Sequence, residues 1–141
     1  MEQFVVFITH HWILSTLWGI CLAGFFINEY LQRRFNAKSV TPEQAVLWIN
    51  HQGALVIDIR GDSAFAEGHI LDSEHFPKHQ WKKKIKNLHK QKEKPIILVC
   101  NAGHDSLKLA NELQQKGFVR AVTLGGGIQA WKMAGLPLVK S

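Results

Sequence analysis

The residues with the clearest chemical potential lie around Cys100, in the run Val99-Cys100-Asn101-Ala102-Gly103-His104-Asp105-Ser106. This run joins an apolar strand-like segment to a helical one, and ligands of open α/β sheets collect at the carboxyl ends of strands. A cysteine before a helix N-terminus faces unpaired backbone N–H groups, which stabilise an anion. Gly103 allows the turn that directs these groups inward. The pattern predicts a nucleophilic Cys100; the alternative is a strand-end cysteine that only packs in the core.

The cysteines, histidines and glycines give little support to a metal site or a dinucleotide-binding site. The chain has two cysteines, Cys21 and Cys100, which form neither a CxxC pair nor a zinc-finger spacing. Cys100 and His104 lack further residues to complete a metal site. The run Gly125-Gly126-Gly127 lacks the spaced glycines and the following strand of a dinucleotide-binding fingerprint. We therefore expect no metal and no cofactor.

Helix and strand patterns alternate in the part of the chain that carries Cys100. Thr41-Pro42-Glu43 predicts a helix start, because threonine caps a helix and proline suits its first position. Such alternation predicts an α/β domain around a parallel sheet. The expected elements are a helix ending at Gly53, a strand at 54–59, a short helix at 62–68, an amphipathic helix with Trp81, Ile85 and Leu88 on its buried face, a strand at 96–99, a helix with Leu107, Ala110 and Leu113 ending at Gly117, a strand at 121–124 and a helix at 128–134.

The positive charge of the chain is concentrated in one segment. The 141 residues include 17 Lys and Arg against 11 Asp and Glu, a formal charge of +6. The segment Lys78–Lys94 holds eight lysines and one glutamate, so it carries +7 and the rest of the chain carries −1. This segment predicts a solvated helix face, or a surface for anionic lipid headgroups formed by Lys82, Lys83, Lys84 and Lys86. Nucleic acid is not expected as a partner, because no binding motif accompanies the charge and aromatic residues do not alternate with the lysines.

An uncharged segment precedes the α/β pattern. Residues 4–27 contain no Asp, Glu, Lys or Arg, and a helix needs about 20 apolar residues to cross a bilayer. We expect an N-terminal membrane anchor over residues 1–36, spanning at about 4–30, and a domain over residues 37–141. Basic residues follow the segment and none precedes it, which predicts a cytoplasmic C-terminal side. A buried core helix is the alternative, and a cleaved signal peptide is disfavoured because a positive n-region and a small-residue cleavage site are absent from the sequence.

Four motifs occur in order between about Val40 and Val139. They are Val56-Ile57-Asp58-Ile59-Arg60, Glu67-Gly68-His69-Ile70, the six-residue loop Cys100–Asp105 followed by Ser106, and Gly126-Gly127-Ile128-Gln129-Ala130-Trp131-Lys132-Met133-Ala134-Gly135-Leu136-Pro137. Together they resemble a single rhodanese (sulfurtransferase) domain, and an anchor before one such domain resembles the membrane-anchored rhodanese-like proteins of proteobacteria. The resemblance implies a rhodanese-like parallel sheet flanked by helices, in a single-pass protein of the bacterial inner membrane whose domain faces the cytoplasm.

The activity implied by the resemblance is transfer of sulfane sulfur. Cys100 is expected to take sulfur from thiosulfate or from a protein persulfide, and to pass it from a persulfide to cyanide or to a thiol acceptor. Asp58, Arg60 and His69 occupy motif positions that support the loop. The loop is expected to bind the persulfide and the anionic oxygens of the donor through its backbone amides, which belong to Asn101, Ala102, Gly103, His104, Asp105 and Ser106.

Asp105 departs from the family pattern. Many rhodaneses place arginine at this sixth loop position, where its two-pronged geometry grips an anion. A carboxylate repels thiosulfate instead, and a protonated His104 offers only partial compensation. We therefore expect poor use of thiosulfate, or a persulfide donor on another protein. The rival interpretation is a rhodanese-like binding module with little turnover; a cysteine phosphatase is disfavoured because its loop is one residue longer and ends in arginine.

Overall fold

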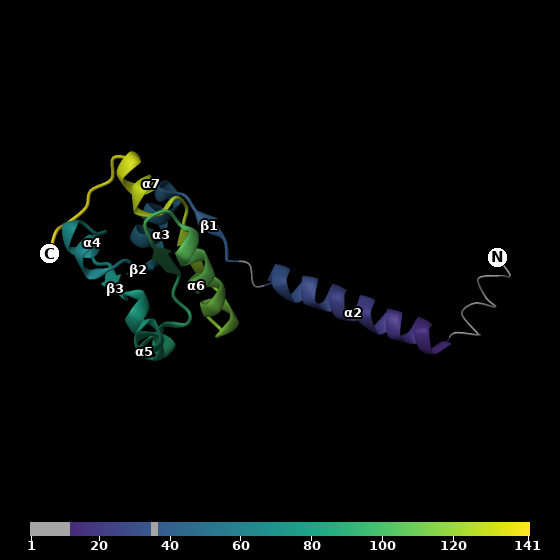
Figure 1. The fold of residues 1–141 in the computed structure, drawn as a ribbon. Coiled ribbons are helices and arrows are strands. Elements are labelled where there is room, and N and C mark those ends of the chain that lie inside the picture. Colours follow the sequence, from purple (N-terminus) through teal and green to yellow (C-terminus); the bar gives the residue numbers. More distant parts are fainter. Residues whose placement is uncertain (1–11, 35–36) are drawn as a thin grey trace. The chain divides into compact units, whose positions relative to one another are not determined.

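A computed structural model describes residues 12–34 and 37–141 (Figure 1). Contacts between residues divide the chain into two units, 1–36 and 37–141. In the first unit, helix α2 covers Trp12–Arg34. Its segment Trp12–Leu31 is long and apolar enough to cross a bilayer, and none of its most apolar window is buried. The predicted span also includes residues 4–11, which lie outside the described residues.

The second unit is built on one parallel sheet of five strands, with the order β1-β5-β4-β2-β3. The three central strands confirm the predicted ones: β2 at Leu55–Asp58, β4 at Ile96–Val99 and β5 at Ala121–Leu124. The edge strands β1 (Ser39–Val40) and β3 (Glu74–His75) were not predicted. Each has only two residues, too few to show a periodic pattern.

Helices cover both faces of this sheet (Figure 1). Helix α3 (Pro42–Gln52) begins at the predicted cap, where the Thr41 hydroxyl accepts the N–H of Gln44, and ends at Gly53 with a φ of 61°. The other helices are α4 (Asp62–Glu67), α6 (His104–Gln115) and α7 (Gly127–Met133). At the end of α6 the N–H of Phe118 reaches the carbonyl of Leu113 at 3.0 Å, as the glycine at 117 predicts.

The predicted buried face of α6 is wrong by one residue. Leu107 is exposed, whereas Ser106, Ala110 and Leu113 are fully buried. Positions 106, 110 and 113 follow helical spacing as well as 107, 110 and 113 do. The hydroxyl of Ser106 can be buried because it forms hydrogen bonds inside the domain. A pattern of apolar residues in the sequence does not reveal those partners.

The lysine-rich segment forms three short elements instead of one amphipathic helix. A 3-10 turn η1 (Lys78–Gln80) leads into α5 (Trp81–Lys84) and then into a 3-10 stretch η2 (Ile85–Gln91). The predicted buried stripe is confirmed, because Trp81, Ile85 and Leu88 are all buried. Lysines four residues apart repel each other in a regular helix, and the start of α5 has no side-chain cap. Both features weaken a continuous helix.

Two cores lie on opposite faces of the sheet. Along β4, Ile96 and Leu98 belong to the core that contains Trp81, whereas Ile97 and Val99 belong to the core that contains Trp131. Side chains alternate between the faces of a strand. Cys100 continues the alternation and joins the Trp81 core, which determines the face on which the following loop opens.

Candidate active site

Cys100 stands at the carboxyl end of the central strand β4, and its side chain is 5% exposed. The sulfur accepts the backbone N–H of Gly103 at 2.9 Å. Gly103 has a φ of 93°, a conformation that favours glycine, and it directly precedes α6. The predicted turn is therefore present. It directs a backbone donor and the positive end of a twelve-residue helix toward the thiol.

Ser106 connects the sulfur to the interior of the domain. Its Oγ lies 3.2 Å from Cys100 Sγ and donates to the Gly103 carbonyl at 3.1 Å. The same hydroxyl contacts Oγ1 of Thr123 on β5, which in turn is 3.4 Å from the carbonyl of Leu98. Ser106 and Thr123 are both buried. This chain of hydroxyls fixes the loop to two strands. The only sequence signal for Thr123 was a hydroxyl residue in an apolar strand.

The start of α7, at the end of the glycine run after β5, holds the cysteine loop through backbone contacts. The N–H of Ile128 donates to the Cys100 carbonyl at 2.8 Å, and that of Gln129 to the Asn101 carbonyl at 3.3 Å. Gly127 has a φ of 59°, and a Cβ added to it would lie 2.2 Å from the Cys100 carbonyl oxygen. Two backbones thus touch at a place that has no room for a side chain. This contact explains in physical terms why glycine stands at position 127.

Arg60 brings a buried guanidinium to the site. Its Nη2 lies 2.7 Å from Oδ2 of Asp58 and 2.6 Å from the Gly68 carbonyl, and the side chains of this ion pair are 5% and 1% exposed. The carboxylate also accepts the backbone N–H of Arg60 at 3.0 Å. Asp58 and Arg60 therefore fix the turn that follows β2, at the strand end next to β4.

A pocket of about 350 Å³ opens beside the thiol, and we call it the Cys100 pocket. Two of the predicted loop residues, Asn101 and Asp105, line it. The full lining consists of Ile59, Arg60, Gly61, Pro77, Lys78, His79, Cys100, Asn101 and Asp105. The structure therefore brings together the carboxyl end of β4, the turn after β2 and the start of the lysine-rich segment. Sequence reasoning missed the contribution of this last segment, which gave no motif.

Asp105 is paired with a lysine. Its Oδ2 lies 2.5 Å from Nζ of Lys78, and both side chains are about half exposed. The hydrogen bond from Lys78 lowers the pKa of the Asp105 carboxyl, and the charges of Lys78, Lys108 and His104 add to this effect. Sequence reasoning named only His104 as the compensating cation. The cation in contact with the carboxylate is Lys78, which comes from a different element.

The remaining predicted site residues have other positions. The ring of His69 hydrogen-bonds to the Phe65 carbonyl at 2.9 Å and stacks on the Phe65 ring, and its backbone pairs with Val139. His69 thus joins α4 to the C-terminal segment and does not line the Cys100 pocket. Ala102 and His104 are exposed. Within residues 12–34 and 37–141, no three His, Cys, Asp or Glu side chains are placed to hold a metal ion.

Known proteins resemble this chain in both sequence and structure. A family model for the rhodanese-like domain matches residues 41–134. The uncharacterized protein YibN of Escherichia coli strain K12 is 30% identical over 141 residues, which cover 99% of each chain. The thiosulfate sulfurtransferase GlpE of Pseudomonas putida is 35% identical over 95 residues, covering 67% of this chain and 84% of GlpE. The crystal structure of a rhodanese-related protein from Thermoplasma volcanium superposes on this chain with a TM-score of 0.64 and 29% sequence identity. The match covers 74% of this chain and 99% of the Thermoplasma chain.

Proposed function

Since the chain belongs to the rhodanese-like family, we propose that it is a membrane-anchored sulfurtransferase that carries sulfane sulfur on Cys100. The observation that carries this proposal is the 2.9 Å contact from the Gly103 N–H to the Cys100 sulfur, at the N-terminus of α6. A backbone donor in that position stabilises both a thiolate and the anionic outer sulfur of a persulfide. The thiol also faces a pocket that is open to small molecules.

The reaction consists of two displacements at sulfur. In the first, the Cys100 thiolate attacks the outer sulfur of thiosulfate, the S–S bond of thiosulfate breaks, and sulfite leaves with the bonding electron pair. In the second, an acceptor thiolate or cyanide attacks the outer sulfur of the Cys100 persulfide, and the Cys100 thiolate is the leaving group. No external oxidant or reductant is needed, because in each displacement the attacking group supplies the electron pair of the new bond and the leaving group takes the pair of the broken bond. The role of the loop is to hold negative charge at each stage.

Intact mass measurement on the full chain tests this function. After incubation with thiosulfate or with a low-molecular-weight persulfide, the protein should gain the mass of one sulfur atom and lose it on addition of cyanide. A Cys100→Ala variant should gain nothing, whereas a Cys21→Ser variant should behave like the natural chain. If no donor produces a Cys100-dependent persulfide, the sulfurtransferase proposal is wrong and a rhodanese-like binding module is the better description.

The anchor and its orientation form part of the same proposal. The segment Trp12–Leu31 of helix α2 supports a single membrane span, and the basic residues Arg33, Arg34 and Lys38 that follow this span favour a cytoplasmic domain at the bacterial inner membrane. In spheroplasts, a membrane-impermeant thiol reagent should leave a cysteine introduced at Ser141 unmodified until the membrane is permeabilised. Modification of that cysteine in intact spheroplasts would place the domain on the opposite side.

The lysine surface is proposed to contact anionic lipid headgroups. Lys82, Lys83 and Lys86 are exposed, which supports the proposal. Nζ of Lys84 instead donates to the His75 carbonyl at 2.5 Å and lies 5.2 Å from the centre of the Phe76 ring. We therefore assign the lipid contact to the other three lysines. Residues 37–141 should bind vesicles containing phosphatidylglycerol at low salt and be released at high salt, and salt-independent or absent binding would contradict the assignment.

A further inference from the structure

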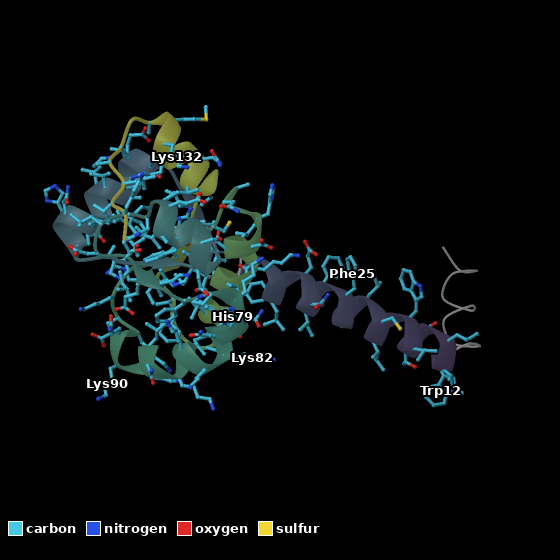
Figure 2. The ribbon with its side chains drawn as sticks, turned by 60° about the vertical axis from the view of Figure 1, so that its left-hand side comes forward. Trp12, Phe25, His79, Lys82, Lys90 and Lys132 are labelled. Carbon is cyan, nitrogen blue, oxygen red and sulfur yellow. The ribbon has the colours of Figure 1, made fainter. Side chains whose placement is uncertain are left out.

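A second depression adjoins the Cys100 pocket, and we call it the Trp81 groove. It has a volume of about 440 Å³, and Trp81, Lys82, Lys108 and Leu109 are among the residues that line it. It shares Lys78, His79 and Asp105 with the Cys100 pocket. The two hollows are therefore neighbours, as they must be if one ligand is to reach Cys100 and occupy the groove as well. Figure 2 shows His79 and Lys82 on the same side of the domain.

The groove combines an apolar base with a positive edge. Trp81 is buried and Leu109 is half-buried, whereas Lys82 and Lys108 are exposed. In the described part of the chain, no carboxylate forms an ion pair with either lysine. The carboxylates that line the groove already have partners, Asp105 in Lys78 and Glu112 in Lys116 and the indole N–H of Trp81, which lies 3.3 Å from Glu112 Oε2. Two positive charges thus remain for a ligand, next to a surface that suits hydrocarbon.

We propose that the Trp81 groove binds the carboxylate-bearing body of a small thiol that accepts sulfur from Cys100. The proposal rests on the sulfurtransferase function and names the class of acceptor for it. A small molecule is favoured over a protein because the groove and the Cys100 pocket share three lining residues and have the size of ordinary ligand sites. In the transfer step, the acceptor thiolate bonds to the outer sulfur of the persulfide, the S–S bond to Cys100 breaks, and Cys100 retains the electron pair as a thiolate.

Discharge of the persulfide by three thiols of different charge tests this assignment. Full-length chain in detergent, carrying Cys21→Ser, is first loaded with thiosulfate. The rate of sulfur loss is then measured by intact mass with mercaptosuccinate, 2-mercaptoethanol and cysteamine. The test variant combines Lys82→Ala with Lys108→Ala. The matched control is Lys90→Ala, which removes a lysine of the same segment that lines neither hollow and lies away from His79 and Lys82 in Figure 2.

At low salt, the double variant should lose about fivefold in the discharge rate with the dicarboxylate mercaptosuccinate, the scale of two exposed charge contacts. The rate with neutral 2-mercaptoethanol should stay within about twofold, and that with the cation cysteamine should rise. Lys90→Ala should leave all three rates unchanged. Equal changes with all three thiols, or no change with mercaptosuccinate, would overturn the proposal; in the latter case Lys82 would retain only the lipid contact proposed above.

A second measurement separates failure of this proposal from failure of the sulfurtransferase function. A nucleophilic Cys100 should react directly with aromatic disulfides, so in the Cys21→Ser background its rates with the dianion 5,5′-dithiobis(2-nitrobenzoate) and with neutral 2,2′-dithiodipyridine report on the groove without any persulfide. The double variant should lower the ratio of the anionic to the neutral rate about fivefold. If no persulfide forms but this ratio falls, the groove binds anions and the transfer reaction is what fails. If persulfide forms but the ratio is unchanged, the groove proposal fails alone.

Discussion

The Nζ atom of Lys78 lies 2.5 Å from Oδ2 of Asp105, and both residues line the Cys100 pocket. The lysine comes from η1 and the aspartate from the first turn of α6, so the pair joins two elements that are distant in the sequence. It brings a cation to the edge of a loop that contains no arginine. A carboxylate that looks repulsive in the sequence is therefore compensated in the fold.

Lys78→Ala should weaken the use of an anionic donor. Without the lysine, Asp105 keeps its negative charge and repels thiosulfate, so the KM for thiosulfate should rise about three- to tenfold while loading by a neutral donor changes little. Lys83→Ala is the control, since Lys83 lines neither the Cys100 pocket nor the Trp81 groove. A rise in KM equally large for the control would show that the effect is a general loss of positive charge.

The same pair predicts a pH response. Lys78 lowers the pKa of the Asp105 carboxyl, so the pair favours the folded state above the ordinary aspartate pKa of about 3.9 and loses this contribution as the pH falls through the depressed value. A carboxyl titration followed by NMR should therefore show Asp105 ionising at lower pH in the natural chain than in Lys78→Ala. Coincident titration curves would contradict the pairing.

Asp105→Arg should improve the use of thiosulfate. The substitution removes the repulsive charge and adds a donor that binds oxyanions through two N–H groups. We expect the KM for thiosulfate to fall about tenfold, and a smaller fall in Asp105→Asn, which only removes the charge. Steady-state rates of sulfite release measure both. An arginine variant no better than the asparagine variant would mean that removing the charge accounts for the whole effect.

Ser106→Ala should damage both the loop and the reaction. The hydroxyl contacts Cys100, Gly103 and Thr123 in the core, and losing it leaves buried groups without partners at a cost of about 1–3 kcal/mol. The free energy of unfolding measured in urea should fall by this amount, and the alkylation rate of Cys100 should change. Ser73→Ala is a matched control, because Oγ of Ser73 is buried without a hydrogen-bond partner. That variant should be neutral, and a similar loss at both positions would contradict the assigned network.

Gly127→Ala should unfold the site or the domain. The added Cβ would meet the Cys100 carbonyl oxygen at 2.2 Å, in a backbone conformation with a φ of 59° that disfavours alanine. We expect a loss of at least about 3 kcal/mol in the free energy of unfolding, measured by urea denaturation. Gly61→Ala is the control, since no heavy atom lies within 4 Å of its added Cβ. An unchanged stability in Gly127→Ala would mean that the two backbones separate at little cost.

Local pattern was enough to predict the central strands, the cap of α3, the end of α6 and the cysteine loop. Each of these depends on residues close in sequence: Thr41 caps its own helix, and Gly103 turns the chain beside Cys100. The edge strands β1 and β3 escaped prediction because two-residue strands exist only through their neighbours in the sheet. The burial of Ser106 in place of Leu107 escaped it because Thr123, its partner, lies on another strand.

What the sequence alone determined is the chemistry of the reactive segment, since a cysteine, a glycine and a helix start are properties of adjacent residues. What only the tertiary structure decided is the charge around that segment. Lys78 reaches Asp105, and the Trp81 groove shares lining residues with the Cys100 pocket, because folding brings the lysine-rich segment beside the start of α6. Electrostatic energy depends on distance in space, and distance along the chain does not reveal it.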